Sequence, residues 1–111
     1  MNPLISEIKE AVREYYGLTE EQFLNPSSAR RYSGPRQVAM WFASWMTDKS
    51  YPQIGKAFGR DHTTVIHARK AVEARRSGLV DDIRAIKALI ERAVERRDIY
   101  RAPIASIGIE A

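Results

Sequence analysis

The sequence predicts an all-α domain of six helices, two of which form a helix-turn-helix. Three observations predict this fold. Apolar residues recur at helical spacing along most of the 111 residues. Capping residues and turn-forming glycines separate these stretches, and no stretch shows the alternation of a strand. With 44% hydrophobic residues, the chain can bury one modest core, so we expect a single domain over residues 1–97 and a tail over residues 98–111.

The first two predicted helices are marked by their ends. Asn2 and Pro3 predict a helix start, because an Asx side chain caps free amides and proline suits the first helical position. Gly17 can supply the C-terminal turn of this helix. Thr-Glu-Glu-Gln at residues 19–22 matches a capping box, which predicts a short second helix to about Leu24.

A third helix is predicted to start at Pro35, after a loop over residues 25–34. Residues 35–47, PRQVAMWFASWMT, are apolar around most of the circumference of a helix. A helix that is hydrophobic on nearly all sides is a buried one. We therefore expect it to be the central element of the core, with both Trp41 and Trp45 packed inside.

The next two helices form the predicted helix-turn-helix. Ser50 and Gln53 match a capping box for a helix of about two turns, with Pro52 in its first turn. Gly59 ends that helix, and Asp61 can cap the following one at the amides two or three residues later. Two helices joined by a tight glycine turn have the plan of a helix-turn-helix.

A last helix is predicted from residue 79 to about Arg97, with a tail over residues 98–111 that shows no clear periodicity. Its apolar stripe consists of Leu79, Ile83, Ile86, Ile90, Ala93 and Val94. The stripe approximates a heptad seam, and the tail is rich in isoleucine, so one alternative is a protein-protein interaction module that forms a homodimer through residues 79–111. The other is that the helix packs on its own domain.

The net charge of +4 is unevenly distributed. Residues 25–76 contain ten Lys and Arg against three Asp and Glu, whereas residues 1–24 contain two against five and residues 77–111 contain six against six. A basic middle segment is expected of a nucleic-acid binder, because phosphate contacts supply most non-specific affinity, although a solvated surface has the same composition.

Residues 57–70, AFGRDHTTVIHARK, hold both histidines of the chain. Metal binding is disfavoured, because two histidines five residues apart do not share a helical face as an i, i+4 pair does. Hydrolytic catalysis is disfavoured, because adjacent residues at a helix start diverge and no oxyanion element accompanies them. The chain has no cysteine, which excludes disulfides, thiolate metal sites and cysteine nucleophiles. Because no acid/base constellation or cofactor loop is found either, we expect no enzyme activity, metal or cofactor.

Base readout fits this stretch best. The first turn of the second helix of a helix-turn-helix enters the major groove, where short polar side chains reach base edges. Asp61 is therefore expected to act as a helix cap, a base contact or both. Thr63 and Thr64 have the alternative of being ordinary helix residues, and His67 that of an ordinary packed or surface histidine.

The run from Pro52 to Glu73, PQIGKAFGRDHTTVIHARKAVE, closely resembles the signature of the C-terminal DNA-binding domain of DnaA, the bacterial replication initiator. PRQVAM at residues 35–40 resembles the other strong block of that domain, and the resemblance covers roughly residues 4–97. It implies an all-helical fold and binding to double-stranded DNA at a short A/T-rich site, TTATNCACA.

The resemblance also implies the residues that contact DNA. It places Arg30 in the minor groove, where narrow A/T-rich stretches attract guanidinium groups. The residues implied to read bases in the major groove are Asp61, His62, Thr63 and Thr64. Those implied to contact the backbone are Arg36, Gln37, Thr47, Tyr51, Pro52 and His67. We expect further phosphate contacts from Lys56, Arg60, Arg69 and Lys70.

Two departures from the family bear on function. The sequence has no GxxxxGK[ST] phosphate loop, so we expect no nucleotide binding and a stand-alone relative that regulates replication or transcription. One glycine, Gly59, precedes Arg60 where the family usually has two, so the turn is one residue shorter. With no signal peptide or spanning segment in the sequence, we expect a cytoplasmic, nucleoid-associated protein without membrane contacts.

Overall fold

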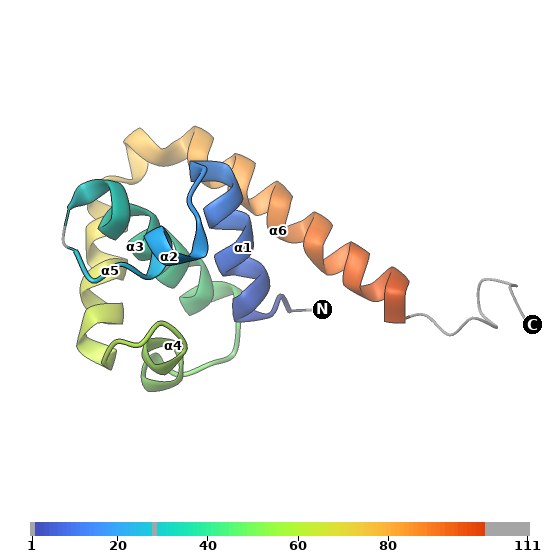
Figure 1. Cartoon of the computed structure of the whole chain (residues 1–111), viewed down its shortest axis with the longest axis horizontal. Helices are drawn as coiled ribbons and strands as arrows, with labels where there is room; N and C mark the ends of the chain where they lie inside the picture. The colour runs from blue at the N-terminus through green and yellow to red at the C-terminus, as the bar shows by residue number, and fades with distance from the viewer. Residues whose placement is uncertain (1, 28, 102–111) are drawn as a thin grey trace, which may run out of the picture.

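This computed structural model describes residues 2–27 and 29–101 of the chain. These residues form six α-helices and one short 3-10 helix, joined by short loops (Figure 1). In chain order they are α1 Ile5–Tyr16, α2 Glu20–Leu24, α3 Arg30–Met46, α4 Tyr51–Ala57, α5 His62–Ala74, the 3-10 helix η1 Arg76–Leu79 and α6 Val80–Arg101. The predicted all-α fold is confirmed. Residues 102–111 of the predicted tail lie outside the described residues.

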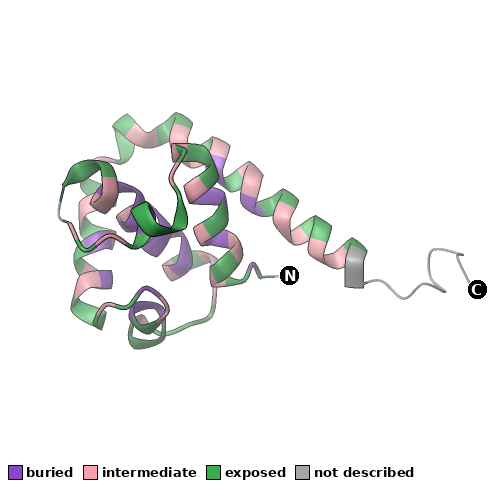
Figure 2. Cartoon of the chain, viewed as in Figure 1, coloured by how far each residue is buried: buried purple, intermediate pink, exposed green. Residues whose placement is uncertain are grey.

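Helix α3 is the centre of the core, as predicted. It packs against α1, α2, α4 and α5, and Figure 2 shows its buried stretch inside the domain. Its buried apolar residues are Val38, Ala39, Met40, Trp41, Phe42 and Ala43. The prediction was wrong for Trp45, which is 47% exposed although its ring meets that of Trp41 edge to face, with the ring centres 5.5 Å apart.

Both predicted capping boxes are present. The Thr19 hydroxyl accepts from the Gln22 amide at 3.1 Å, and the Gln22 side chain accepts from the Thr19 amide at 2.9 Å. The same exchange joins Ser50 and Gln53, at 3.3 Å and 2.8 Å. Because each box satisfies two amides that a helix start leaves unpaired, α2 and α4 begin where the sequence predicts.

Helix α1 begins two residues later than predicted. Leu4 precedes its first turn, and the Leu4 amide donates to the Glu7 carboxylate at 2.7 Å, which satisfies the start of the helix from within the first turn. Pro3 is buried ahead of the helix instead of opening it. The predicted end is correct, because Gly17 has a φ of 69° in the left-handed region.

Helix α3 begins at Arg30, five residues before the predicted start at Pro35. The side chains of Asn25 and Ser27 each accept from the amide two residues later, and these local turns lead into the helix. Pro35 therefore lies inside α3. It is the sixth residue of the helix, and because it has no amide it leaves the Arg31 carbonyl without its hydrogen bond from four residues later.

Helix α6 uses the predicted apolar stripe inside the domain. Ile86 and Ile90 are fully buried, and α6 packs along α1. The Arg97 guanidinium pairs with the Glu7 carboxylate at 2.9 Å and 3.0 Å, which ties the far part of α6 to the start of α1. Two isoleucines of the seam that motivated a homodimer are thus buried by the chain itself, whereas Ile83 and Ala93 are half-buried, and the homodimer stays a prediction.

The predicted end of α6 at Arg97 was four residues too early. The helix continues to Arg101, because no proline or glycine occurs between these two arginines to stop it. Within the described residues, no helix is both long and apolar enough to cross a membrane. The same residues contain no group of three or more acidic, histidine or cysteine side chains placed to hold a metal ion.

The turn between α4 and α5 depends on two glycines. Gly59 has a φ of 67°, a conformation that other residues rarely adopt. Gly55 lies so close to the turn that a Cβ atom there would come within 2.6 Å of the Arg60 carbonyl oxygen and 2.9 Å of the Asp61 carbonyl. The Arg60 amide donates to the Gly55 carbonyl at 2.8 Å across this contact. The angle between α4 and α5 is therefore set by direct contact between the backbone of α4 at Gly55 and the backbone of the turn.

We expect Gly55→Ala to destabilise the fold by about 1–3 kcal/mol, the usual cost of overpacking a tight site, because the added methyl meets backbone that cannot rotate away. Thermal unfolding followed by circular dichroism measures the change. Gly78→Ala is the matched control, because a Cβ at Gly78 meets no atom within 4 Å. Equal melting temperatures for the two variants would contradict the expectation.

Candidate nucleic-acid interface

Asp61 caps the start of α5, as the sequence predicts. Its Oδ1 accepts from the Thr64 amide at 3.1 Å and the Thr64 hydroxyl at 3.3 Å, and it also accepts from the Thr63 hydroxyl. These hydrogen bonds, that from the Thr63 side chain most of all, lower the pKa of Asp61. The group is therefore ionised at neutral pH, and since Oδ2 takes part in none of these bonds, capping leaves acceptor capacity for a ligand.

The first turn of α5 presents polar side chains to the outside. Asp61, His62 and Thr63 are exposed and Thr64 is half-buried, whereas Val65 behind them is fully buried. Further along, Ala68 and Val72 continue the buried face, and His67 and Lys70 continue the exposed one. Because the buried face packs on α3 and α4, the helix is held with its predicted reading residues outward.

Helix α4 adds exposed groups beside α5. Pro52 and Lys56 are exposed, and Arg60 in the turn is half-buried. The half-buried Tyr51 receives a hydrogen bond on its hydroxyl from the Arg69 guanidinium, which also lies 5.8 Å from the centre of the Tyr51 ring. Tyr51 and Arg69 thus join the start of α4 to the middle of α5 and hold each other in place.

Arg30 lies at the first residue of α3 and is exposed. It lines the same surface groove as Arg75, which directly follows the last residue of α5. Arg30 and Asp61 are therefore near opposite ends of α5. For a helix of 13 residues this corresponds to a separation of about 20 Å along its axis.

Arg36 is placed differently from an exposed phosphate contact. Its side chain is 5% exposed, and its guanidinium donates to the carbonyl oxygens of Phe23 at 3.3 Å and Ser27 at 2.8 Å, and also to that of Asn25. Burial, and to a smaller extent the charge of Arg60, lowers its pKa. This arrangement anchors the loop before α3 and leaves little of Arg36 exposed, and its implied contact with the DNA backbone stays a prediction.

Gln37 and Thr47 also have partners within the domain. The Gln37 side-chain oxygen accepts from the Arg75 guanidinium at 2.8 Å. The Thr47 hydroxyl donates to the Ala43 carbonyl at 2.7 Å, at the end of α3. Both side chains are half-buried, so each retains a surface through which the implied backbone contact can form. For these two residues that contact stays a prediction.

Lys9 supports the helix-turn-helix from α1 and was missed by sequence reasoning. Its ammonium group donates to the carbonyl of Ala57, the last residue of α4, and lies 4.8 Å from the centre of the Phe58 ring. Burial lowers the pKa of Lys9, and the charge of Glu20 partly opposes this. A contact between residues 48 positions apart leaves no local signal in the sequence.

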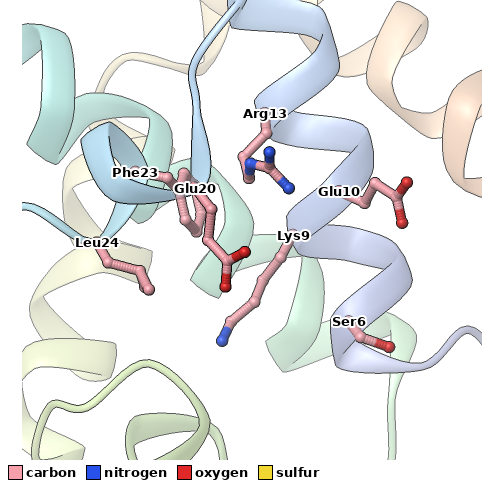
Figure 3. A pocket seen from close by; sticks show the side chains of 7 residues that line it. All are labelled: Ser6, Lys9, Glu10, Arg13, Glu20, Phe23 and Leu24. Atoms are coloured by element: carbon pink, nitrogen blue, oxygen red, sulfur yellow. The ribbon is translucent and has the colours of Figure 1, made fainter.

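The pocket that contains Lys9 is no candidate ligand site. It measures about 280 Å³ between α1 and α2, and its lining includes the cations Lys9 and Arg13 and the acids Glu10 and Glu20 (Figure 3). Two positive and two negative charges leave no net charge to attract an ion. The exposed positive groups near α4 and α5 are thus better placed to meet a ligand than this pocket.

A sequence profile described as the helix-turn-helix of the bacterial DnaA protein matches residues 5–72. The match runs from the start of α1 almost to the end of α5, and so includes the whole helix-turn-helix. The chain belongs to this family.

Individual proteins that resemble this chain belong to the same family. The chromosomal replication initiator protein DnaA of Caulobacter vibrioides NA1000 is 45% identical over 74 residues, which is 66% of this chain and 15% of the relative. That of Sphingopyxis alaskensis is 46% identical over 87 residues, 75% of this chain and 19% of the relative. That of Cereibacter sphaeroides ATCC 17029 is 38% identical over 91 residues, which is 78% of this chain and 20% of the relative. The aligned part of the chain thus spans no more than a fifth of these curated relatives.

Family membership sets the start of α5 within a DNA-binding helix-turn-helix. The expected base-reading residues at that start are brought together on one exposed turn, and the expected minor-groove arginine is exposed at the other end of α5. Helix α6 and η1 lie beyond the matched range.

We expect Asp61→Ala to lower the melting temperature, because it removes the acceptor for the Thr64 amide at the start of α5. Asp61→Asn is the matched control, since asparagine caps helices about as well as aspartate but carries no charge. Circular dichroism melts of both variants test this. An Asn variant as destabilised as the Ala variant would show that the charge, and not the cap, stabilises α5.

Proposed function

We propose that the chain binds double-stranded DNA with sequence specificity, with the first turn of α5 in the major groove and Arg30 in the adjacent minor groove, at sites related to TTATNCACA. The observation that carries the proposal is the exposed turn of Asp61, His62 and Thr63, held outward at the start of the second helix of a DnaA-type helix-turn-helix. Recognition helices of this motif contact base edges with their N-terminal residues.

The chemistry of this turn suits base edges. The free oxygen of Asp61 can accept from cytosine N4, and the imidazole of His62 can bond to a purine edge. The Thr63 hydroxyl is already bonded to Asp61, so its methyl group is the part best placed for contact with a thymine methyl. The contacts with cytosine N4 and with the thymine methyl each distinguish one base pair, whereas a bond to purine N7 distinguishes purine from pyrimidine.

The position of Arg30 fits a second groove. Its separation from Asp61 along α5, about 20 Å, is close to half of a DNA helical turn of about 34 Å. Half a turn is the spacing between a major groove and the neighbouring minor groove on one face of a duplex. An arginine in the minor groove favours A/T-rich sequence, because the narrow groove concentrates negative potential.

Phosphate contacts supply affinity around these two points. Lys56 and Lys70 are exposed on α4 and α5, and neither forms an ion pair with a carboxylate among the described residues. Their charges are therefore available to displace counterions from a duplex. Pro52, Arg60, His67 and the Tyr51–Arg69 pair border the same surface and complete the proposed backbone contacts.

The proposed role is regulation at such sites. The matched relatives are named as chromosomal replication initiators, and this chain aligns only with a small part of each. A protein that occupies the same duplex sites through this domain competes with an initiator or marks the site for transcription control. DNA binding of this kind requires no catalytic group.

We expect a fluorescein-labelled duplex carrying TTATNCACA to bind more tightly than its scramble, and the preference to persist when salt is raised. His62→Ala and Thr63→Ala should each reduce the preference by about 1–3 kcal/mol, because each removes a base contact. Fluorescence anisotropy measures both affinities. Arg84→Ala, an exposed arginine on α6, is the control and should leave the preference unchanged. Wild-type affinity that is equal for the two duplexes would overturn the proposed specificity.

Lys56→Ala should instead weaken binding to both duplexes equally. Loss of one phosphate contact reduces the slope of log K against log salt by about 1 and leaves base discrimination intact. Anisotropy titrations over a salt series test this, with Lys87→Ala on the exposed face of α6 as the matched control. A slope that Lys56→Ala leaves at the wild-type value would place Lys56 outside the interface.

A further inference from the structure

A groove of about 410 Å³ lies on the surface where the end of α1, the start of α3 and the start of α6 meet. Its apolar lining consists of Tyr16, Leu18, Pro35, Val38 and Leu79. Three of these side chains, Tyr16, Leu18 and Leu79, are half-buried and pack against the core from the groove side. The volume lies in the usual range of binding pockets, about 300–1,000 Å³, and suits one or two large apolar side chains.

The rim of this groove is strongly positive. Arg30, Arg31 and Arg75 line it, against the single acid Asp82. Asp82 is already engaged, because its two carboxylate oxygens accept from the hydroxyls of Tyr15 and Tyr16, each at 2.9 Å. No carboxylate among the described residues forms an ion pair with any of the three arginines. An occupant that brings its own carboxylates would neutralise this rim.

The apolar floor of the groove and its arginine rim together indicate the chemical class of the occupant. A duplex would meet the arginines with its phosphates but has no protruding apolar group to fill the floor. A protein segment with large apolar side chains next to Asp or Glu matches both features at once. Arginine forms bidentate hydrogen bonds with carboxylates, which gives such a segment a defined orientation.

We propose that this arginine-rimmed groove is the docking site for an acidic, apolar segment of a partner protein. Its apolar side chains fill the floor over Leu18 and Leu79, and its carboxylates bind Arg31 and Arg75. Arg30 lines the same groove. If Arg30 also enters the minor groove, which rests on the proposed function, a docked segment and a duplex compete for it, and the partner releases the protein from DNA.

The first experiment tests the groove without reference to DNA. The full 111-residue chain is used to select binders from a displayed library of random short peptides, and the enriched peptides are measured by fluorescence anisotropy. We expect peptides that combine Asp or Glu with large apolar residues. Arg31→Glu and Leu79→Ser should each weaken their binding at least tenfold, whereas the matched controls Arg84→Glu and Leu24→Ser, exposed residues that do not line the groove, should not.

The outcomes distinguish a docking site for a partner from the alternatives. Circular dichroism checks that each variant is folded, and if Leu79→Ser is not, the exposed Arg31→Glu decides alone. Peptides without acidic bias, or peptides that the groove variants and the control variants bind equally, would overturn the docking site. Sedimentation without peptide shows whether the chain self-associates. Self-association that Arg31→Glu abolishes would assign the groove to a second copy and also overturn the proposal.

The second experiment tests the competition. Binding of the TTATNCACA duplex is measured alone first, and the duplex is then titrated against the protein-peptide complex. Release of the peptide by the duplex supports exclusion through Arg30, and a ternary complex overturns it. If the duplex fails to bind alone, the proposed function fails, while the docking site is still decided by the groove variants.

Discussion

The contact of Gly55 with the backbone of the turn before α5 governs the geometry of the candidate interface. Because no Cβ intervenes, the carbonyls of Arg60 and Asp61 approach α4 closely, and this fixes where α5 starts. Asp61 then caps α5 from a position set by that contact. The same end of α4 is tied to α1 by Lys9, which donates to the carbonyl of Ala57. The direction of the exposed turn thus depends on backbone packing that reaches from the first helix to the fifth.

Helix α3 extends the same rigid frame to the other end of the interface. Its buried Arg36 holds the carbonyl of Phe23 in α2 and those of Asn25 and Ser27 in the loop, so the loop and the first turn of α3 keep a fixed place relative to the core. Arg30 stands on that first turn. The buried Arg36, through its hydrogen bonds, thus supports the turn that carries the exposed Arg30. The two arginines lie six residues apart and have different structural roles.

Features set by neighbouring residues could be predicted from the sequence, and features set by distant contacts could not. The capping pairs Thr19–Gln22 and Ser50–Gln53 act within three residues, so their pattern is sufficient. The start of α3 was missed because proline is a stronger signal than the weak turns before it. The exposed side of Trp45, the burial of Arg36 and the bond from Lys9 all depend on which elements lie opposite, which periodicity does not specify. The exposure of Asp61, His62 and Thr63 followed from the motif itself.

Helix α6 has a practical consequence for how this domain can be used. It contains 22 residues, about 33 Å of helix, and Figure 1 shows its far end pointing away from α5. Its pairing of Arg97 with Glu7 keeps it aligned with α1 almost to that end. The helix therefore works as a rigid spacer. A fluorophore attached to the exposed Glu95, in the last two turns of this helix, would be carried away from α5 and would leave the start of α5 accessible.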